Sequence, residues 1–352
     1  MPVLVDIDSR DHHLFRGDEN CAEALSESPK VMAGTVNIGL INNMPDSALV
    51  STERQLFELL SAAAGTLPVR LRLYTLASIP RTDWGQQYIS RFYSAIDNLW
   101  ESDLDGLIVT GAEPLASNLA EEPYWDSFGQ VIDWAKENTV STVLSCLAVH
   151  GAVLHLDGID RNRLAEKCIG VFNQATMIDH PLMLGAPLEL GIPHSRWNDV
   201  REDSLVISGH SILTKSADAG VDIFVKQQKK SLFVYFQGHP EYEAQSLLGE
   251  YRRDIGRFFR REIEFYPTMP KGYFDSEAEQ LLTAFQRRAL SYRRTELLGT
   301  FPAERVAANL TNTWHSAATL IYRNWILYLS TGRTQRITVP RSVMTRGSVI
   351  SQ

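Results

Sequence analysis

The sequence has little cysteine: Cys21, Cys146 and Cys168 are its three thiols. They are too few and too unevenly spaced for a disulfide framework, and no Cys-x-x-Cys pair suggests a zinc site. The N-terminus carries Asp6 and Asp8 where a signal peptide would need an apolar core, and no apolar run approaches the roughly 20 residues of a membrane helix. These absences predict reduced thiols, no metal, no membrane segment and a cytoplasmic location.

A basic stripe is also absent. The net charge is -8 and is spread along the chain, which argues against nucleic acid as a partner. With 44% hydrophobic and 22% charged residues, the 352-residue chain has an ordinary globular composition. It is long enough to bury a substantial core, so we expect a folded, enzyme-like body.

The chain alternates short apolar, β-branched stretches with stretches of helical periodicity. The expected strands are 36–44, 69–76, 104–111 and 141–146, with helices over 52–64 and 124–138. Such alternation predicts an α/β fold with a central, mostly parallel sheet flanked by helices. Further strands are expected at 204–210, 222–228 and 231–239, the last two forming a hairpin at Lys229 and Lys230.

The ends of the chain differ from this body. Residues 1–34 are polar and weakly periodic and predict an N-terminal arm before an α/β domain over 35–265. Helical patterns at 243–259, 276–298 and 303–329 predict C-terminal helices, those of 266–331 packed on the same domain. Residues 332–352 lack periodicity and predict a flexible tail.

The sharpest motif is the stretch Thr142–Ala152, in which an apolar strand reaches Cys146 and passes at once into a small-residue helix. This pattern is typical of a nucleophile elbow, where the following amides and the helix dipole favour a thiolate and a developing oxyanion. The alternative is that Cys146 is a small buried side chain at a strand end, the commoner fate of a cysteine.

A second motif is Gln237–Tyr242, which follows an apolar strand and precedes a helix. His239 is then expected at the carboxyl edge of the sheet, with Glu241 orienting its imidazole toward a thiol. Alternatively, His239 caps a helix and Glu241 lies near its positive end. Two such motifs at one sheet edge favour a catalytic pair.

The turn at Gly111 and Ala112 ends a third strand. Its small residues allow a backbone amide to approach a substrate carbonyl, so Ala112 and Leu147 are expected to supply the oxyanion hole. An ordinary turn between strand and helix would have the same sequence.

Taken in order, these three motifs resemble the class I glutamine amidotransferase-like (flavodoxin-like) fold. From about residue 36 to 330 the chain resembles the homoserine O-succinyltransferase family, the MetA-type homoserine transacylases. The matching stretches are Asn43-Met44-Pro45, Thr52-Glu53-x-Gln55, 104–112, Tyr124-Trp125, 141–149, Glu166-Lys167-x-x-Gly170-Val171-Phe172, 193–197, 238–247 and Asn324-Trp325.

The resemblance implies that Cys146 carries an acyl group from acyl-CoA, with His239 as proton acceptor and Glu241 as its support. It also implies substrate contacts from Lys167, Ser195 and Arg253, which would otherwise pass for ordinary surface polar residues. Acyl-CoA is then a co-substrate, no cofactor is bound permanently, and the expected assembly is a homodimer.

Three departures leave the substrates open. Leu115 stands where succinyl-selective relatives have Gly and acetyl-selective relatives have Glu. Asp46-Ser47-Ala48 stands where the family usually has lysines, and Gln174 lies in a stretch that often carries a histidine in relatives. The resemblance favours succinyl-CoA and L-homoserine, in the first committed step of methionine biosynthesis. Acetyl-CoA as donor, L-serine as acceptor and a glutamine amidotransferase-like hydrolase remain alternatives.

Overall fold

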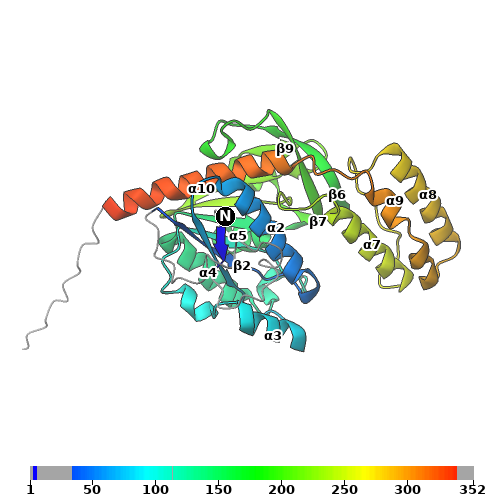
Figure 1. The fold of residues 1–352 in the computed structure, drawn as a ribbon, viewed down its shortest axis with the longest axis horizontal. Coiled ribbons are helices and arrows are strands. Elements are labelled where there is room, and N and C mark those ends of the chain that lie inside the picture. Colours follow the sequence, from blue (N-terminus) through cyan, green and yellow to red (C-terminus); the bar gives the residue numbers. More distant parts are fainter. Residues whose placement is uncertain (1–2, 6–33, 113, 339–352) are drawn as a thin grey trace, which may run out of the picture.

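The computed structural model describes residues 3–5, 34–112 and 114–338. Its centre is an eight-stranded sheet in the order β1-β3-β2-β4-β5-β12-β11-β8 (Figure 1). The six strands β1, β3, β2, β4, β5 and β12 are all parallel to one another, whereas β11 is antiparallel to both of its neighbours, β12 and β8. The predicted mostly parallel α/β sheet is therefore confirmed. The strands are β1 (Val3–Val5), β2 (Val36–Ile41), β3 (Val69–Tyr74), β4 (Gly106–Val109), β5 (Ser141–Ser145), β8 (Ser211–Ile212), β11 (Ile223–Gln228) and β12 (Ser231–Phe236).

Helices cover both faces of this sheet. α2 (Asp46–Ala64) and α10 (His315–Thr338) pack on one face, and α4 (Trp125–Asn138) and α5 (Leu147–Asp157) on the other. Because strand side chains alternate between faces, Val234 of β12 joins the first cluster and Tyr235 the second. The remaining elements on this body are α3 (Asp83–Phe92), η2 (Ile96–Leu99) and η3 (Leu119–Glu121).

A second, four-stranded sheet has the order β10-β9-β6-β7 and was not predicted. Its strands are β6 (Asn162–Thr176), β7 (Glu189–Asp199), β9 (Thr214–Ser216) and β10 (Gly220–Val221), with η4 (Pro181–Met183) between β6 and β7. The β6–β7 register shifts between Arg163 and Cys168, and this irregularity breaks the alternation that would have marked β6 as a strand.

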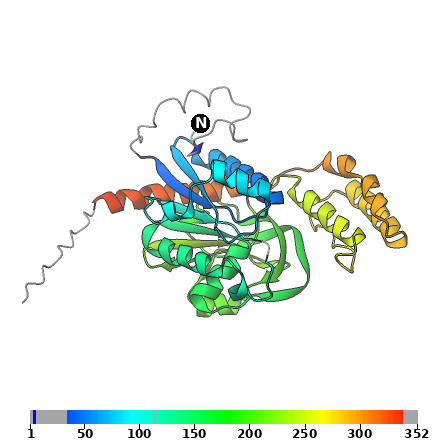
Figure 2. The ribbon, with the colours of Figure 1, turned by 90° about the horizontal axis from the view of Figure 1, so that it is seen from below.

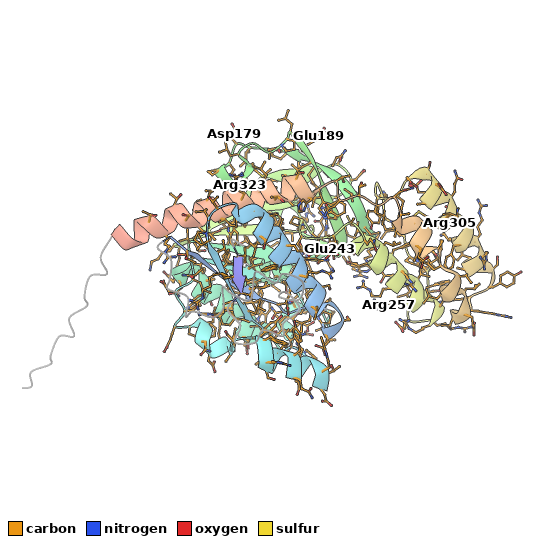
Figure 3. The ribbon with its side chains drawn as sticks, in the orientation of Figure 1. Asp179, Glu189, Glu243, Arg257, Arg305 and Arg323 are labelled. Carbon is orange, nitrogen blue, oxygen red and sulfur yellow. The ribbon has the colours of Figure 1, made fainter. Side chains whose placement is uncertain are left out.

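A third hydrophobic cluster joins α7 (Ser246–Phe259), α8 (Ser276–Ser291), η5 (Thr295–Thr300) and α9 (Ala303–Ala307). Its interior includes Ile255, Phe258 and Phe285, and the group lies beside the sheet rather than over it (Figure 2). Charged side chains such as Arg257 and Arg305 project from its surface (Figure 3). Of the predicted C-terminal helices, α8 and α9 therefore pack on α7, and α10 packs on the main sheet.

Several predicted elements differ from the structure. Residues 204–210 are not a strand: α6 (Glu202–Ile207) occupies most of that stretch, with acidic residues in its first turn where the helix dipole favours them, and only Leu205 is buried. The helix expected over 303–329 is split into α9 and α10. α10 continues through Thr338, beyond the expected start of the tail at 332.

Val3–Val5 of the predicted arm pair with β3, while residues 6–33 and 339–352 lie outside the described residues. None of the described helices is both long and apolar enough to cross a membrane.

Candidate active site

Cys146 lies at the elbow between β5 and α5. It is the single residue between the last residue of the strand and the first residue of the helix. Its φ of 51° and ψ of -112° are unusual for a residue with a side chain. Its amide donates to the Phe236 carbonyl at 2.8 Å, and its carbonyl accepts from the Val149 amide at 3.0 Å. The structure thus has the strained strand-to-helix turn that the sequence predicts.

Three strand ends meet at this edge because β4, β5 and β12 run parallel. The turn at Gly111 lies directly against Leu147: a Cβ built on Gly111 would be 2.6 Å from the Leu147 Cβ and 3.0 Å from its amide nitrogen. Only glycine permits this approach. The Gly111–Ala112 turn and the Leu147 amide are therefore adjacent, as an oxyanion hole requires; the role itself stays a prediction.

His239 follows β12 and pairs with Glu241. The distance from His239 Nδ1 to Glu241 Oε1 is 2.8 Å, and both side chains are more than nine-tenths buried. Burial alone would lower the pKa of His239, but Glu241 and the nearby Cys146 thiol raise it well above its usual value. The imidazole thus faces a carboxylate on one side and the sulfur on the other, the arrangement of a thiol nucleophile with an oriented base.

The predicted substrate residues Lys167, Ser195 and Arg253 converge on one carboxylate, Glu250 of α7. Lys167 Nζ is 3.3 Å from Glu250 Oε2, Arg253 Nη2 is 3.4 Å from the same oxygen, and the Ser195 hydroxyl donates to it. Burial would raise the pKa of Glu250, but Lys167 and Arg253 lower it to about 2. The four side chains form a charged site beside the thiol and imidazole.

Tyr242 connects the two groups. Its ring stacks on His239, and its hydroxyl donates to Glu250 Oε1. Lys167 has a second partner in Asp254, at 2.7 Å. Sequence reasoning missed Tyr242, Glu250 and Asp254. The available signal was the spacing of Glu250 and Arg253, which places both on one side of an amphipathic helix.

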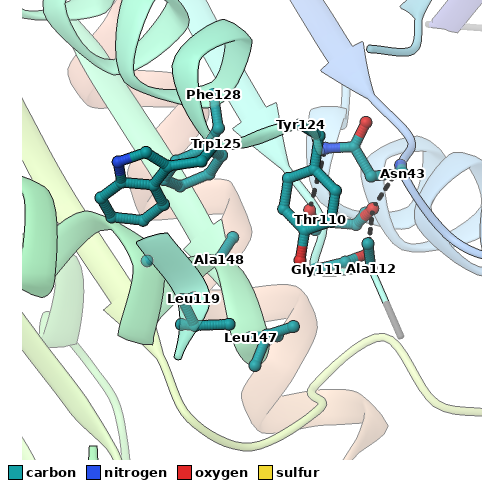
Figure 4. Close-up of a pocket in the computed structure, with 11 residues that line it drawn as sticks. Asn43, Thr110, Gly111, Ala112, Leu119, Tyr124, Trp125, Phe128, Leu147 and Ala148 are labelled. Atoms are coloured by element: carbon teal, nitrogen blue, oxygen red, sulfur yellow. Dashed lines mark hydrogen bonds between the residues drawn. The ribbon is translucent and has the colours of Figure 1, made fainter. Parts of the chain in front are cut away.

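A narrow pocket opens beside the Gly111–Ala112 turn (Figure 4), with about 290 Å³ of free space, part of it open to solvent. Its lining is mainly apolar and comprises Asn43, Thr110, Gly111, Ala112, Leu119, Tyr124, Trp125, Phe128, Leu147, Ala148 and Gly151. The Tyr124 hydroxyl points toward the turn and has no hydrogen-bond partner in the described part of the chain. The pocket thus begins at the predicted oxyanion hole.

Leu115, the predicted acyl-specificity residue, does not line this pocket and is 72% exposed. Its amide and that of Ala116 both donate to Glu122 Oε1 at 2.7 Å, so the buried Glu122 side chain holds this loop. Arg161 braces the same loop by donating to the Ser117 carbonyl at 2.8 Å. The loop backbone is well fixed, whereas the Leu115 side chain faces solvent.

Cys168 belongs to the second sheet. Cys168 lies half-buried in β6, where burial raises its pKa, and Cys21 falls outside the described residues. Within the described ranges, no group of three or more His, Cys, Asp or Glu side chains has an arrangement that could hold a metal ion.

Comparison with known proteins places the chain in a family. A family model described as homoserine O-succinyltransferase matches residues 2–336. The chain belongs to the homoserine O-succinyltransferase family. A homoserine O-succinyltransferase of Rhodopseudomonas palustris is 44% identical, over 89% of this chain and 93% of its own length. Another, of Bradyrhizobium japonicum, is 47% identical over 84% of this chain and 91% of its own length.

Solved structures give more distant matches to this family member. A glutamine amidotransferase of Thermotoga maritima has a TM-score of 0.46 at 10% identity, covering 85% of this chain and 97% of the other. A glutamine amidotransferase of Methylobacillus flagellatus has the same TM-score at 14% identity, over 84% of this chain and 95% of that one.

Proposed function

We propose that this member of the homoserine O-succinyltransferase family transfers a succinyl group from succinyl-CoA to the hydroxyl of L-homoserine through a thioester on Cys146. The reaction is the first committed step of methionine biosynthesis. The proposal is carried by one observation: a strained cysteine at a strand-to-helix elbow lies close enough to perturb an imidazole that a buried carboxylate orients. The family membership supplies the substrates.

In the first half-reaction, His239 takes the proton of Cys146, and the sulfur attacks the thioester carbonyl carbon. The negative charge then develops on the carbonyl oxygen, where the amides of Ala112 and Leu147 are placed to donate. The bond from carbon to the sulfur of CoA breaks, and CoA leaves as a thiol with the proton from His239. Cys146 is left as an acyl thioester.

In the second half-reaction, the homoserine hydroxyl gives its proton to His239 and attacks the acyl carbon. The Cys146 sulfur leaves and regains the proton from the imidazolium, and the product is an O-acyl amino acid. Glu241 stabilises the imidazolium in both halves, because its carboxylate is 2.8 Å from Nδ1.

The charged site around Glu250 suits the amino acid acceptor. The Arg253 side chain is 57% exposed and can pair with the acceptor carboxylate, while Glu250 presents a negative charge for its ammonium group. Lys167, at 8% exposure, is held by Glu250 and Asp254 and offsets one of their two negative charges. Ser195 contacts Glu250, so its hydroxyl also lies at this site.

The pocket beside the oxyanion hole is the natural place for the acyl chain. Its small side chains, Ala112 and Ala148, leave room next to the carbonyl position, and Tyr124 adds a hydroxyl that no described residue binds. A hydroxyl of this kind favours an acyl group with a distal polar atom, such as succinyl, over acetyl.

Mass spectrometry of the intact protein after incubation with succinyl-CoA tests this proposal. A mass increase of one succinyl group is expected, lost on addition of homoserine and absent in Cys146→Ala. Parallel incubations with acetyl-CoA and with serine test the alternative donor and acceptor. Release of ammonia from glutamine, without acylation by either CoA ester, would instead favour the amidotransferase-like hydrolase and reject the transferase.

Location in the cytoplasm and a homodimer remain proposals. α10 gives little support for a dimer contact, because Ile321, Trp325 and Leu329 are buried in the protein's own core. Leu327, on the opposite side of this helix, is 46% exposed. Light scattering coupled to size-exclusion chromatography determines the assembly, and cell fractionation the location.

A further inference from the structure

The turn that carries His239 is held by segments from both sheets. The Gln237 amide donates to the Asp222 carbonyl at 3.2 Å, and the Gly238 amide donates to Asp222 Oδ1 at 2.8 Å. The His239 amide donates to the Pro193 carbonyl at 2.8 Å. Of the three consecutive backbone amides at 237–239, the first two therefore donate to a single residue, Asp222.

The contact between Asp222 and this turn is close-packed. A Cβ built on Gly238 would be 2.9 Å from Asp222 Oδ1, 2.9 Å from the Pro193 carbonyl and 2.6 Å from Ile192 Cγ2. No side chain fits there without moving the carboxylate or β7. The position of His239 is thus determined by how Asp222 packs.

Asp222 is also a buried charge. Its side chain has no exposed area, and Oδ2 has no hydrogen-bond partner in the described segments. Burial raises its pKa to about 6, against the opposing effects of the Gly238 amide, Arg196 and His239. The carboxyl is therefore mainly ionised above neutral pH, and an ionised buried carboxylate requires compensating positive charge.

Few groups supply that positive charge. His194 Nε2 is 3.7 Å from Asp222 Oδ1, but burial, Arg196 and His239 hold the pKa of His194 well below its usual value, so this ring is neutral. Arg196 is shared, because it donates to His194 and to the Asn198 and Ala219 carbonyls. The groups that face the imidazole of His239 from its other sides are Glu241, Cys146 and Tyr242.

We propose that Asp222 is a positioning residue that fixes the turn bearing His239 and, as a second buried carboxylate, stabilises its imidazolium form. The catalytic imidazole then has two negatively charged partners. Glu241 binds it by a direct hydrogen bond, and Asp222 acts on it electrostatically without a hydrogen bond. The imidazolium is the form that returns a proton to the departing CoA sulfur, so Asp222 acts on the rate through His239. This inference rests on the proposed role of His239 as base.

Asp222→Asn tests the proposal, since the amide oxygen keeps an acceptor for Gly238 while the charge is lost. The readout is the pH dependence of kcat/KM for succinyl-CoA, whose alkaline limb reports loss of the imidazolium proton. Removing a nearby negative charge lowers the pKa of an imidazole, so this limb moves to lower pH by at least about half a unit. On that limb a shift of half a unit lowers kcat/KM by up to about threefold, so kcat/KM at pH 8 falls measurably.

Asp218→Asn is the matched control, because Asp218 is exposed and lies four residues earlier, in the turn between β9 and β10. This substitution also removes one carboxylate charge, but it should leave the alkaline limb of the kcat/KM profile unmoved. Asp222→Ser, neutral and oxygen-bearing, replaces Asp222→Asn if the latter does not fold. Glu241→Gln gives the larger shift expected of a direct partner.

A folded neutral variant with lowered activity but an unmoved alkaline limb would overturn the electrostatic role and leave only packing. Unchanged activity and an unmoved limb would overturn the inference altogether. Full activity in His239→Ala would instead reject the proposed function, so the two failures are distinguishable.

Discussion

The ring of Tyr242 stacks on the imidazole of His239, with 4.2 Å between the ring centroids and 15° between the planes. The same residue donates its hydroxyl to Glu250. One side chain therefore contacts both the imidazole that we propose as the base and the carboxylate of the charged site that we propose for the amino acid acceptor. In this proposal the two halves of the reaction share a physical connection that can be removed selectively.

Tyr242→Phe removes the hydroxyl and keeps the stacked ring. We expect KM for homoserine to rise about tenfold or more, the value of one hydrogen bond to a charged group, with the rate of Cys146 acylation nearly unchanged. Steady-state kinetics and single-turnover acylation measure the two effects. The control is Tyr273→Phe, whose hydroxyl donates to the Ala244 carbonyl instead. A loss confined to acylation would contradict this division.

Gly111→Ala tests the closeness of the two turns at the oxyanion site. The added Cβ would lie 2.6 Å from the Leu147 Cβ, so the turn must move away from the amide. Loss of one oxyanion donor lowers kcat by about 100-fold or more. Gly299→Ala is the control, because no atom of the described residues lies within 4 Å of the added Cβ there. Equal kinetics in the two variants would show that the turn plays no part in catalysis.

Tyr124→Phe tests the acyl pocket. The hydroxyl is buried and without a partner in the described residues, so its removal should leave the melting temperature unchanged or raise it. We expect kcat/KM for succinyl-CoA to fall about tenfold while that for acetyl-CoA is preserved. The test is to measure kcat/KM for both donors on the same preparation of wild type and of Tyr124→Phe. Equal losses with both donors would mean that the hydroxyl does not contact the acyl group.

Glu250 predicts a pH dependence of stability. Its pKa falls from an ordinary 4.5 in the unfolded chain to about 2 in the folded protein, so its ionised form stabilises the fold. That contribution is fully present above about pH 4.5 and is lost as the pH falls toward 2. It is on the order of 3–4 kcal/mol, since each pKa unit corresponds to about 1.4 kcal/mol.

The measurement is urea denaturation at a series of acid pH values. Glu250→Gln should lower stability at pH 7 and flatten its decline between pH 4.5 and 2. Glu58→Gln, which changes an exposed residue of α2, should keep the wild-type slope. A steep acid decline that persists in Glu250→Gln would place the responsible carboxyl elsewhere.

Much of the main sheet was predictable, because its strands are short apolar stretches set between amphipathic helices. The hairpin at Lys229 and Lys230 was also predicted, and the structure pairs Gln228 with Ser231 there. The second sheet was not predicted. β6 is half-exposed and irregular, so its sequence lacks a clear two-residue period, and nothing local in β7 indicates its partner.

The candidate catalytic residues Cys146 and His239 were accessible to sequence reasoning because each follows closely on an apolar strand. The structure brings Cys146 and His239 together, as expected. Glu250, Tyr242 and Asp222 were missed because their roles depend on contacts between distant segments. Ser195 and Glu250, for example, are 55 residues apart and meet only when β7 and α7 are in place.

The backbone at Cys146 has a thermodynamic consequence. A side chain held at a φ of 51° destabilises the native state relative to glycine by about 1 kcal/mol or more, a penalty offset by the surrounding core. Cys146→Gly should therefore give an inactive protein that melts at a higher temperature than the wild type. Selection for stability alone would replace this cysteine, so its presence reflects selection for a property other than stability.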